Sequence, residues 1–178
     1  TIVNMKHEKQ LSENSSLKTS AYVSLYDFEL YSNFTFFLED PINGDQIRQK
    51  ENRTTFGLNS EFEKRTFIKN TPFSYQFGMG LRQDKVNDIE LSHTANRVTT
   101  LENIMLGDIN ESNLSGYGNT EFKFNKLIVN AGMRYDYFKF DYYDKLSPTY
   151  SNEAVNKGIL SPKLNFLYKY NDKLQLFL

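Results

Sequence analysis

The chain has 178 residues, which suits a single domain, and its 21 basic and 22 acidic side chains leave a net charge of −1. This balance argues against a nucleic-acid-binding protein, and the absence of cysteine excludes disulfides, cysteine-ligated zinc and thiol nucleophiles. No segment approaches the roughly 18 apolar residues of a membrane-spanning helix, whereas a membrane β-barrel stays open because its apolar residues alternate with polar ones.

Apolar and polar residues alternate with a period of two through most of the chain, which predicts about eight β-strands and no helix. In chain order the predicted strands are 2–8, 17–25, 56–63, 73–81, 114–124, 127–138, 160–170 and a last one that begins at 174. We expect strands of about 10–12 residues, near the 9–11 that a tilted bilayer crossing needs.

The predicted connections alternate between short and long. Residues 125–126 and 171–173 have the length and composition of hairpin turns, and 10–16 and 64–72 are also fairly short. The predicted long loops are 39–53, 83–112 and 141–157. An up-and-down sheet would place the short turns on one rim and the long loops on the other, as in outer-membrane barrels.

Aromatic and charged residues indicate which face meets lipid. Tyr135 and Tyr137 are expected near the long-loop end of their strand, and Tyr168 and Tyr170 at the short-turn end of theirs, at the two levels of aromatic girdles. Charges gather on the opposite face, which suits a wet interior. The predicted lumen-facing residues are Glu121, Asn130, Arg134, Asp136, Lys163 and Asn165.

Several segments resemble sequences of TonB-dependent outer-membrane receptors. The segment 26–46 is similar to one of their loops, 131–138 to their Ala-Gly-x-Arg-x-Asp-x-Phe/Tyr strand, 160–164 to their Ser-Pro-Lys strand opening and 114–121 to a Gly-x-Tyr strand. The four segments occur in the family's order and cover about residues 17–178.

This resemblance implies a 22-stranded barrel plugged by an N-terminal domain, in the outer membrane of a bacterium. Such receptors take up ferric siderophores, cobalamin, nickel or sugars, with energy from the TonB complex. Because the chain starts without Met and stops inside an alternating pattern, residues 1–178 are interpreted as one partial barrel of about eight strands, without the plug or the remaining strands. The expected partners are TonB through that plug, a ferric siderophore or similar small ligand, and membrane lipid, with no nucleic acid.

Candidate sites are few. Arg134 and Asp136 are interpreted chiefly as a stabilising ion pair of the lumen. Loops carry recognition in rigid barrels, so the candidates for substrate contact in the outer loops are Arg82, Lys85, His93 and Arg97. No catalytic residue, cofactor site or metal site is predicted, because His93 lacks a nucleophile elbow and the aspartates lack the spacing of a calcium loop.

Two alternatives remain open on the sequence. One is a soluble lipocalin-like barrel with an apolar cavity, for which Leu127, Val129, Ala131 and Met133 would point inward. The other is a complete eight-stranded outer-membrane barrel.

Overall fold

The computed structural model describes residues 1–147, 151–171 and 173–178 as a single antiparallel sheet. Its strands are β1 (Ile2–Ser12), β2 (Ser15–Ser32), β3 (Ile47–Ile68), β4 (Thr71–Ala95), β5 (Thr99–Phe124), β6 (Leu127–Asp144), β7 (Ser151–Asn171) and β8 (Leu174–Phe177). Each strand pairs only with its neighbours along the chain, in the order β1 to β8. The predicted eight strands and up-and-down topology are therefore confirmed. No helix long and apolar enough to cross a membrane is present in the described part of the chain.

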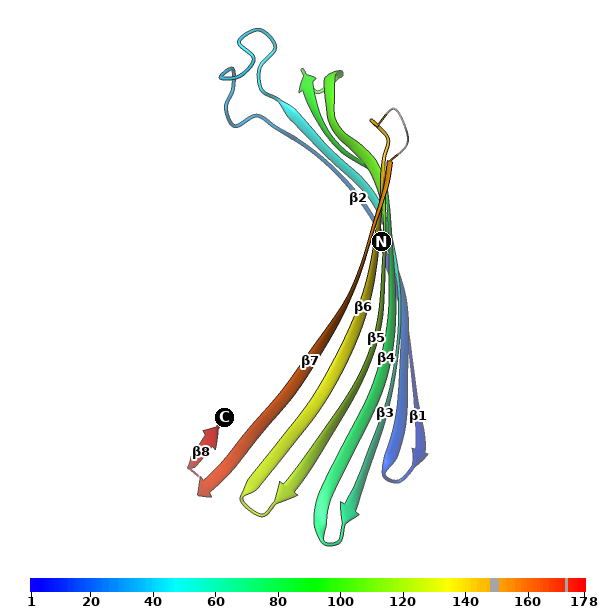
Figure 1. Cartoon of the computed structure of the whole chain (residues 1–178), viewed down its shortest axis with the longest axis vertical. Helices are drawn as coiled ribbons and strands as arrows, with labels where there is room; N and C mark the ends of the chain where they lie inside the picture. The colour runs from blue at the N-terminus through cyan, green and yellow to red at the C-terminus, as the bar shows by residue number, and fades with distance from the viewer. Residues whose placement is uncertain (148–150, 172) are drawn as a thin grey trace.

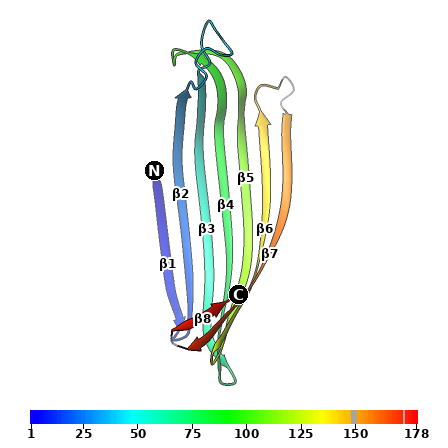
Figure 2. The same ribbon diagram turned by 90° about the vertical axis from the view of Figure 1, so that its left-hand side faces the viewer.

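The sheet is curved and open. Figure 1 shows it nearly edge on as a bow, and Figure 2 shows the long strands side by side from β1 to β7. Among the described residues β1 pairs with β2 alone and β8 with β7 alone, so the eight strands do not close on themselves. This arrangement does not fit a complete eight-stranded barrel or a closed lipocalin-like one.

The predicted strand lengths are wrong, because β2 to β7 contain 18 to 26 residues. The segment 83–112, predicted as a long loop, is almost entirely strand, with only residues 96–98 between β4 and β5. Likewise most of 141–157 belongs to β6 and β7, and the loop between β2 and β3 is confined to 33–46. Polar residues predominate in these extensions and the ladders are irregular there, so apolar residues such as Val86, Ile89 and Ile104 show no sustained alternation for sequence analysis to detect.

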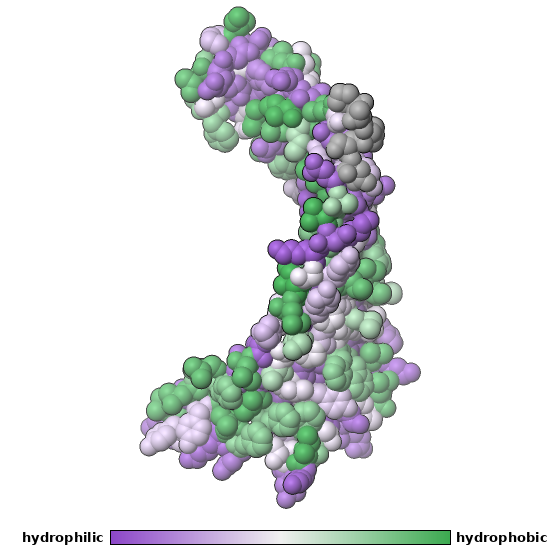
Figure 3. All heavy atoms as spheres, viewed as in Figure 1, coloured by the Kyte–Doolittle hydropathy of each residue, from purple (hydrophilic) through white to green (hydrophobic). Residues whose placement is uncertain are grey.

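An apolar band covers one face of the sheet between the short turns and the middle of the strands. In β4 it runs over nine residues from Phe73 to Leu81, which corresponds to a height of roughly 20–25 Å for tilted strands. Its side chains are exposed: Met79 retains 68% of its accessible surface and Met133 56%. In Figure 3 hydrophobic residues gather over the lower part of the sheet, while hydrophilic residues predominate toward the opposite end.

Aromatic rings mark both edges of this band. Near the short turns Phe73 packs on Phe122 at 4.5 Å between ring centroids, and Tyr75 lies 6.1 Å from Phe62. Tyr168 pairs with Leu127 at the same rim, as predicted. Tyr135 and Tyr137 lie in the middle of β6 instead of near its end, because the strand continues past the band.

The opposite, polar face is the more enclosed one, as expected on the concave side of a curved sheet. Gly80 and Ser115 are buried there, and Tyr117 is half-buried and donates a hydrogen bond to Glu61 on β3. Tyr117 also covers Gly78, where a Cβ atom would collide with the ring. A glycine under a cross-strand tyrosine fixes the register of the pair.

Candidate functional site

The six predicted lumen residues share the polar face. Glu121, Asn130 and Asn165 lie in one row across β5, β6 and β7, and Lys163 stands opposite Gly132. The Arg134 guanidinium donates two hydrogen bonds to Asp136, at 2.7 and 2.8 Å. The structure brings the six onto one surface, and their lining of a lumen stays a prediction.

A hollow of about 680 Å³ lies near the short turns. Polar side chains from four strands line much of it, among them Glu63, Gln76, Asn119, Glu121 and Asn130. Two of the predicted lumen residues therefore border this hollow.

The four predicted outer-loop residues do not form one site. Arg82, Lys85 and His93 lie within β4, which corrects their placement in a loop, and only Arg97 lies in a turn. Arg82 lies on the concave face and is paired with Asp84. Lys85 lies an odd number of positions after Arg82 along β4, so its side chain points to the other face of the sheet, outward. Their contact with a substrate stays a prediction.

The outer arm, meaning residues 27–52 and 87–108, contains several groups of linked polar contacts. It leans over the concave side in Figure 1. The ladders are interrupted between Lys50 and Asn52, between Val86 and Ile89, and twice more in β4 before Thr94. Such irregularities bend a strand locally, which accounts for the lean of the arm.

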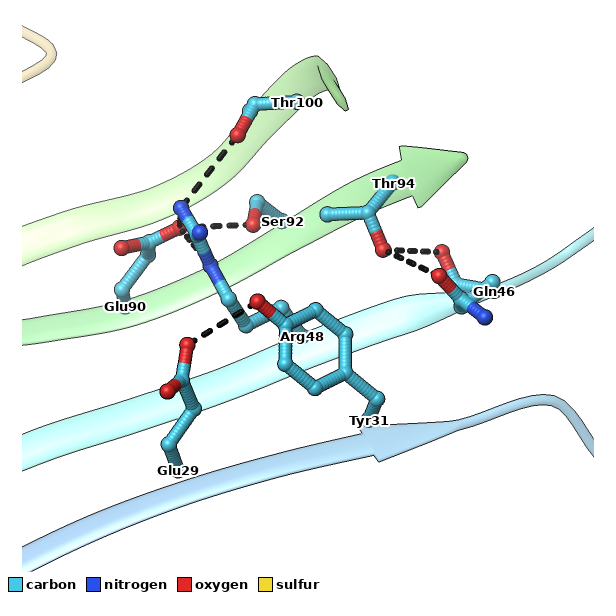
Figure 4. A network of polar contacts seen from close by, with 8 residues as sticks. All are labelled: Glu29, Tyr31, Gln46, Arg48, Glu90, Ser92, Thr94 and Thr100. Carbon is cyan, nitrogen blue, oxygen red and sulfur yellow. Dashed lines mark hydrogen bonds and ion pairs between the residues drawn. The ribbon is translucent and has the colours of Figure 1, made fainter. Parts of the chain in front are cut away.

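An ion pair with a buried carboxylate braces the arm (Figure 4). Arg48 on β3 donates to Glu90 Oε1 on β4 through Nε at 2.9 Å and through a terminal nitrogen at 2.5 Å. Ser92 donates to the same oxygen at 2.7 Å, and Arg48 reaches Thr100 on β5 at 3.2 Å. Burial opposes the charge of Glu90, but the bonds from Ser92 and Arg48 outweigh it and lower the pKa of Glu90. The Arg48 side chain thus connects β3 with both β4 and β5.

The loop 33–46 is ordered by aspartates. Asp45 accepts hydrogen bonds from the backbone N–H groups of Leu38, Glu39 and Asp40 at 2.7 to 3.1 Å. The bond from the Asp40 N–H is the main cause that lowers the pKa of Asp45 to about 2. His93 donates from Nε2 to the Gly44 carbonyl at 2.6 Å and so attaches the loop to β4.

A second contact ties β6 to the β4–β5 hairpin. The Lys145 ammonium lies 2.7 Å from carboxylate oxygens of both Asp88 and Asp108. The hydrogen bond to Asp108, reinforced by Asp88, raises the pKa of Lys145. No cluster of three or more possible metal ligands lies among the described residues.

Sequence analysis did not predict the ion pair between Arg48 and Glu90. The turn signals at Asp40-Pro41 and Asn43-Gly44-Asp45 were visible, but they indicate only a turn. The pairing of Arg48 with Glu90 depends on the register of β3 and β4, which no local pattern reveals.

Comparisons with known proteins agree with this architecture. A family model described as TonB dependent receptor-like, beta-barrel, matches residues 2–178. The chain belongs to the TonB-dependent receptor β-barrel family. No curated protein matches the chain by sequence.

Solved structures share the fold at low sequence identity. The unliganded ferric citrate transporter FecA superposes with a TM-score of 0.84 at 13% identity, over 99% of this chain and 26% of that one. The closed form of the ferric-catecholate import receptor Fiu from Escherichia coli K12 gives 0.67 at 8% identity, over 96% of this chain and 30% of that one. The chain therefore spans about a quarter to a third of the TonB-dependent receptors it resembles.

Proposed function

We propose that the chain forms part of the wall and outer arm of a receptor in the bacterial outer membrane that actively takes up a scarce nutrient. The cargo would be a ferric siderophore or another metal chelate. Energy would come from the TonB complex through a plug domain that is not part of residues 1–178.

One observation carries the proposal. The apolar band faces away from the concave side, while at the level of the band the concave side carries most of the polar and charged residues, such as Glu121, Asn130 and Arg134. This is the distribution expected of a barrel wall between lipid and a wet interior. Family membership adds the mode of transport, and the structural neighbours include ferric citrate and ferric catecholate receptors.

Uptake in cells tests the function. Deletion of the full-length gene should abolish accumulation of radioactive iron supplied as a chelate, and deletion of TonB should have the same effect. Unchanged uptake of every ferric chelate offered would overturn the proposal.

The accessibility of introduced thiols tests which face of the sheet meets water. Single cysteines would be introduced at positions 127–138 of the full-length receptor in membranes and treated with a water-soluble thiol reagent. Residues 1–178 contain no native cysteine that would react with it. Even positions such as Asn130 and Asp136 should react, and odd ones such as Met133 should be protected. Reaction without alternation would contradict the assigned faces.

A further inference from the structure

Two ladders of aromatic rings stand on the concave face above the apolar band. Together with the residues between them on β3 to β5, they are called the vestibule face. The ladder on β2 consists of Tyr22, Tyr26 and Phe28, and the ladder on β6 of Phe138, Phe140 and Tyr142. Within each ladder two rings stack, with Tyr26 and Phe28 at 6.3 Å and 10°, and Phe138 and Phe140 at 5.9 Å and 8°. Strands β3 to β5 separate the two ladders on the concave face.

The arginines between the ladders already have carboxylate partners. Arg82 donates to Asp84 at 2.6 and 3.0 Å, and Arg53 reaches Glu51 at 3.2 Å. Thr55 adds a further hydrogen bond to Asp84 at 2.6 Å. On β3 to β5 these pairs leave little free positive charge for an anionic ligand, and Lys157 on β7 stands opposite Phe138 at the lower end of its ladder.

Acidic groups remain beside the rings. Glu111 stands between Asp84 on β4 and Phe140 on β6, and it forms no ion pair among the described residues. Glu153 stands opposite Tyr142 on the neighbouring strand β7. A carboxylate next to aromatic faces attracts a cation both directly and through the ring quadrupoles.

The outer end of the sheet as a whole carries an excess of negative charge, which also favours a cationic ligand. Segments 22–57, 82–113 and 138–157, which lie beyond the apolar band, contain fifteen acidic and nine basic residues. The remainder contains seven acidic and twelve basic residues. A surface field of one sign raises the local concentration of ligands of the opposite sign and repels those of its own.

We infer that the vestibule face binds a neutral or cationic metal chelate, of the hydroxamate type, and discriminates against polyanionic citrate or catecholate chelates. This inference rests on the proposed function. The aromatic ladders would pack against the organic backbone of the chelate, and Glu111 and Glu153 would face its positive charge.

Binding to the full-length receptor tests the inference. Quenching of intrinsic fluorescence would be titrated with ferrioxamine B, a cationic trihydroxamate, and with ferric citrate, an anion, at low and at physiological salt. Ferrioxamine B should bind at least tenfold more tightly, and the difference should shrink as salt screens the field.

Variants test the named residues. The change Glu111→Gln should weaken binding of ferrioxamine B about tenfold, while Glu13→Gln, which removes one negative charge at the short-turn end, should change it less than twofold. Phe140→Ala should weaken binding of both chelates. The heat-dependent shift of the folded barrel on gels would verify that each variant folds.

The outcomes separate the two proposals. Tighter binding of ferric citrate, or binding of ferrioxamine B that Glu111→Gln leaves unchanged, would overturn the inference while iron uptake still supports the proposed function. Absence of TonB-dependent uptake for every ferric chelate would overturn both.

Discussion

The apolar band and the outer arm are built from the same eight-stranded sheet but are stabilised in different ways. In the band, exposed side chains such as Met79 and Met133 alternate with polar ones that face the concave side. The arm has no such division into an apolar and a polar face, and side-chain contacts of Glu90, Asp45 and Lys145 connect its neighbouring segments. Lipid can stabilise the first region, whereas the second must be held by its own hydrogen bonds in water.

The largest expected effect lies in the band, where depth should set the cost of a charge. Met133→Arg, near the middle of the band, should lower the free energy of unfolding of the full-length barrel in bilayers by about 2–4 kcal/mol. Val129→Arg, in the aromatic row near the short turns, should cost only about 0–1 kcal/mol. The control Asn130→Arg, on the concave face, should fall within about 0.5 kcal/mol of the native protein. Equal costs at all three positions would contradict the difference between the two faces.

In the arm the central test is Glu90→Gln. An amide cannot replace the charge-assisted bonds to Arg48, so opening of the β4–β5 hairpin should become easier by about 1–3 kcal/mol. Hydrogen exchange of the hairpin amides in the full-length protein would measure this change. Glu102→Gln, an exposed change on the same hairpin, is the matched control. If both variants exchange alike, the ion pair does not brace the arm.

The smallest effect is expected in the loop 33–46. Asp45→Asn should loosen the loop and speed chymotrypsin cleavage at its phenylalanines several-fold, because the amide oxygen accepts backbone bonds more weakly than a carboxylate. The change Glu39→Gln removes the same charge without touching these bonds and should leave the cleavage rate unchanged.

The same loop predicts a dependence on pH. The pKa of Asp45 is lowered from 3.8 to about 2, so its contribution to loop order is complete above pH 3.8 and is lost as the pH falls through about 2. Cleavage by an acid-stable protease should therefore be slow at pH 4 and accelerate toward pH 2. Acceleration already at pH 4 would show that Asp45 titrates normally.

Sequence analysis predicted the strands correctly where one face of the sheet is apolar and the other polar, because this difference makes apolar and polar residues alternate. The strands through the band were predicted because one face is apolar, as in Leu127 to Tyr137 and Phe73 to Leu81. The extensions from Gln83 to Ser112 were predicted as a loop because their apolar residues, such as Val86 and Ile104, do not alternate regularly with polar ones. The brace at Arg48 and Glu90 was not predictable, since it depends on which residues of two strands lie side by side.

The pairing of every strand with its chain neighbours alone has a consequence for assembly. Every pairing in this sheet joins residues of a single hairpin, so the chain can form it by zipping one hairpin after another, without bringing distant segments together first. The narrow turns at Lys69 and Asn125, both with a positive φ, would initiate two of these hairpins. The growing wall would then extend in chain order, each completed hairpin offering its free edge as the template for the next.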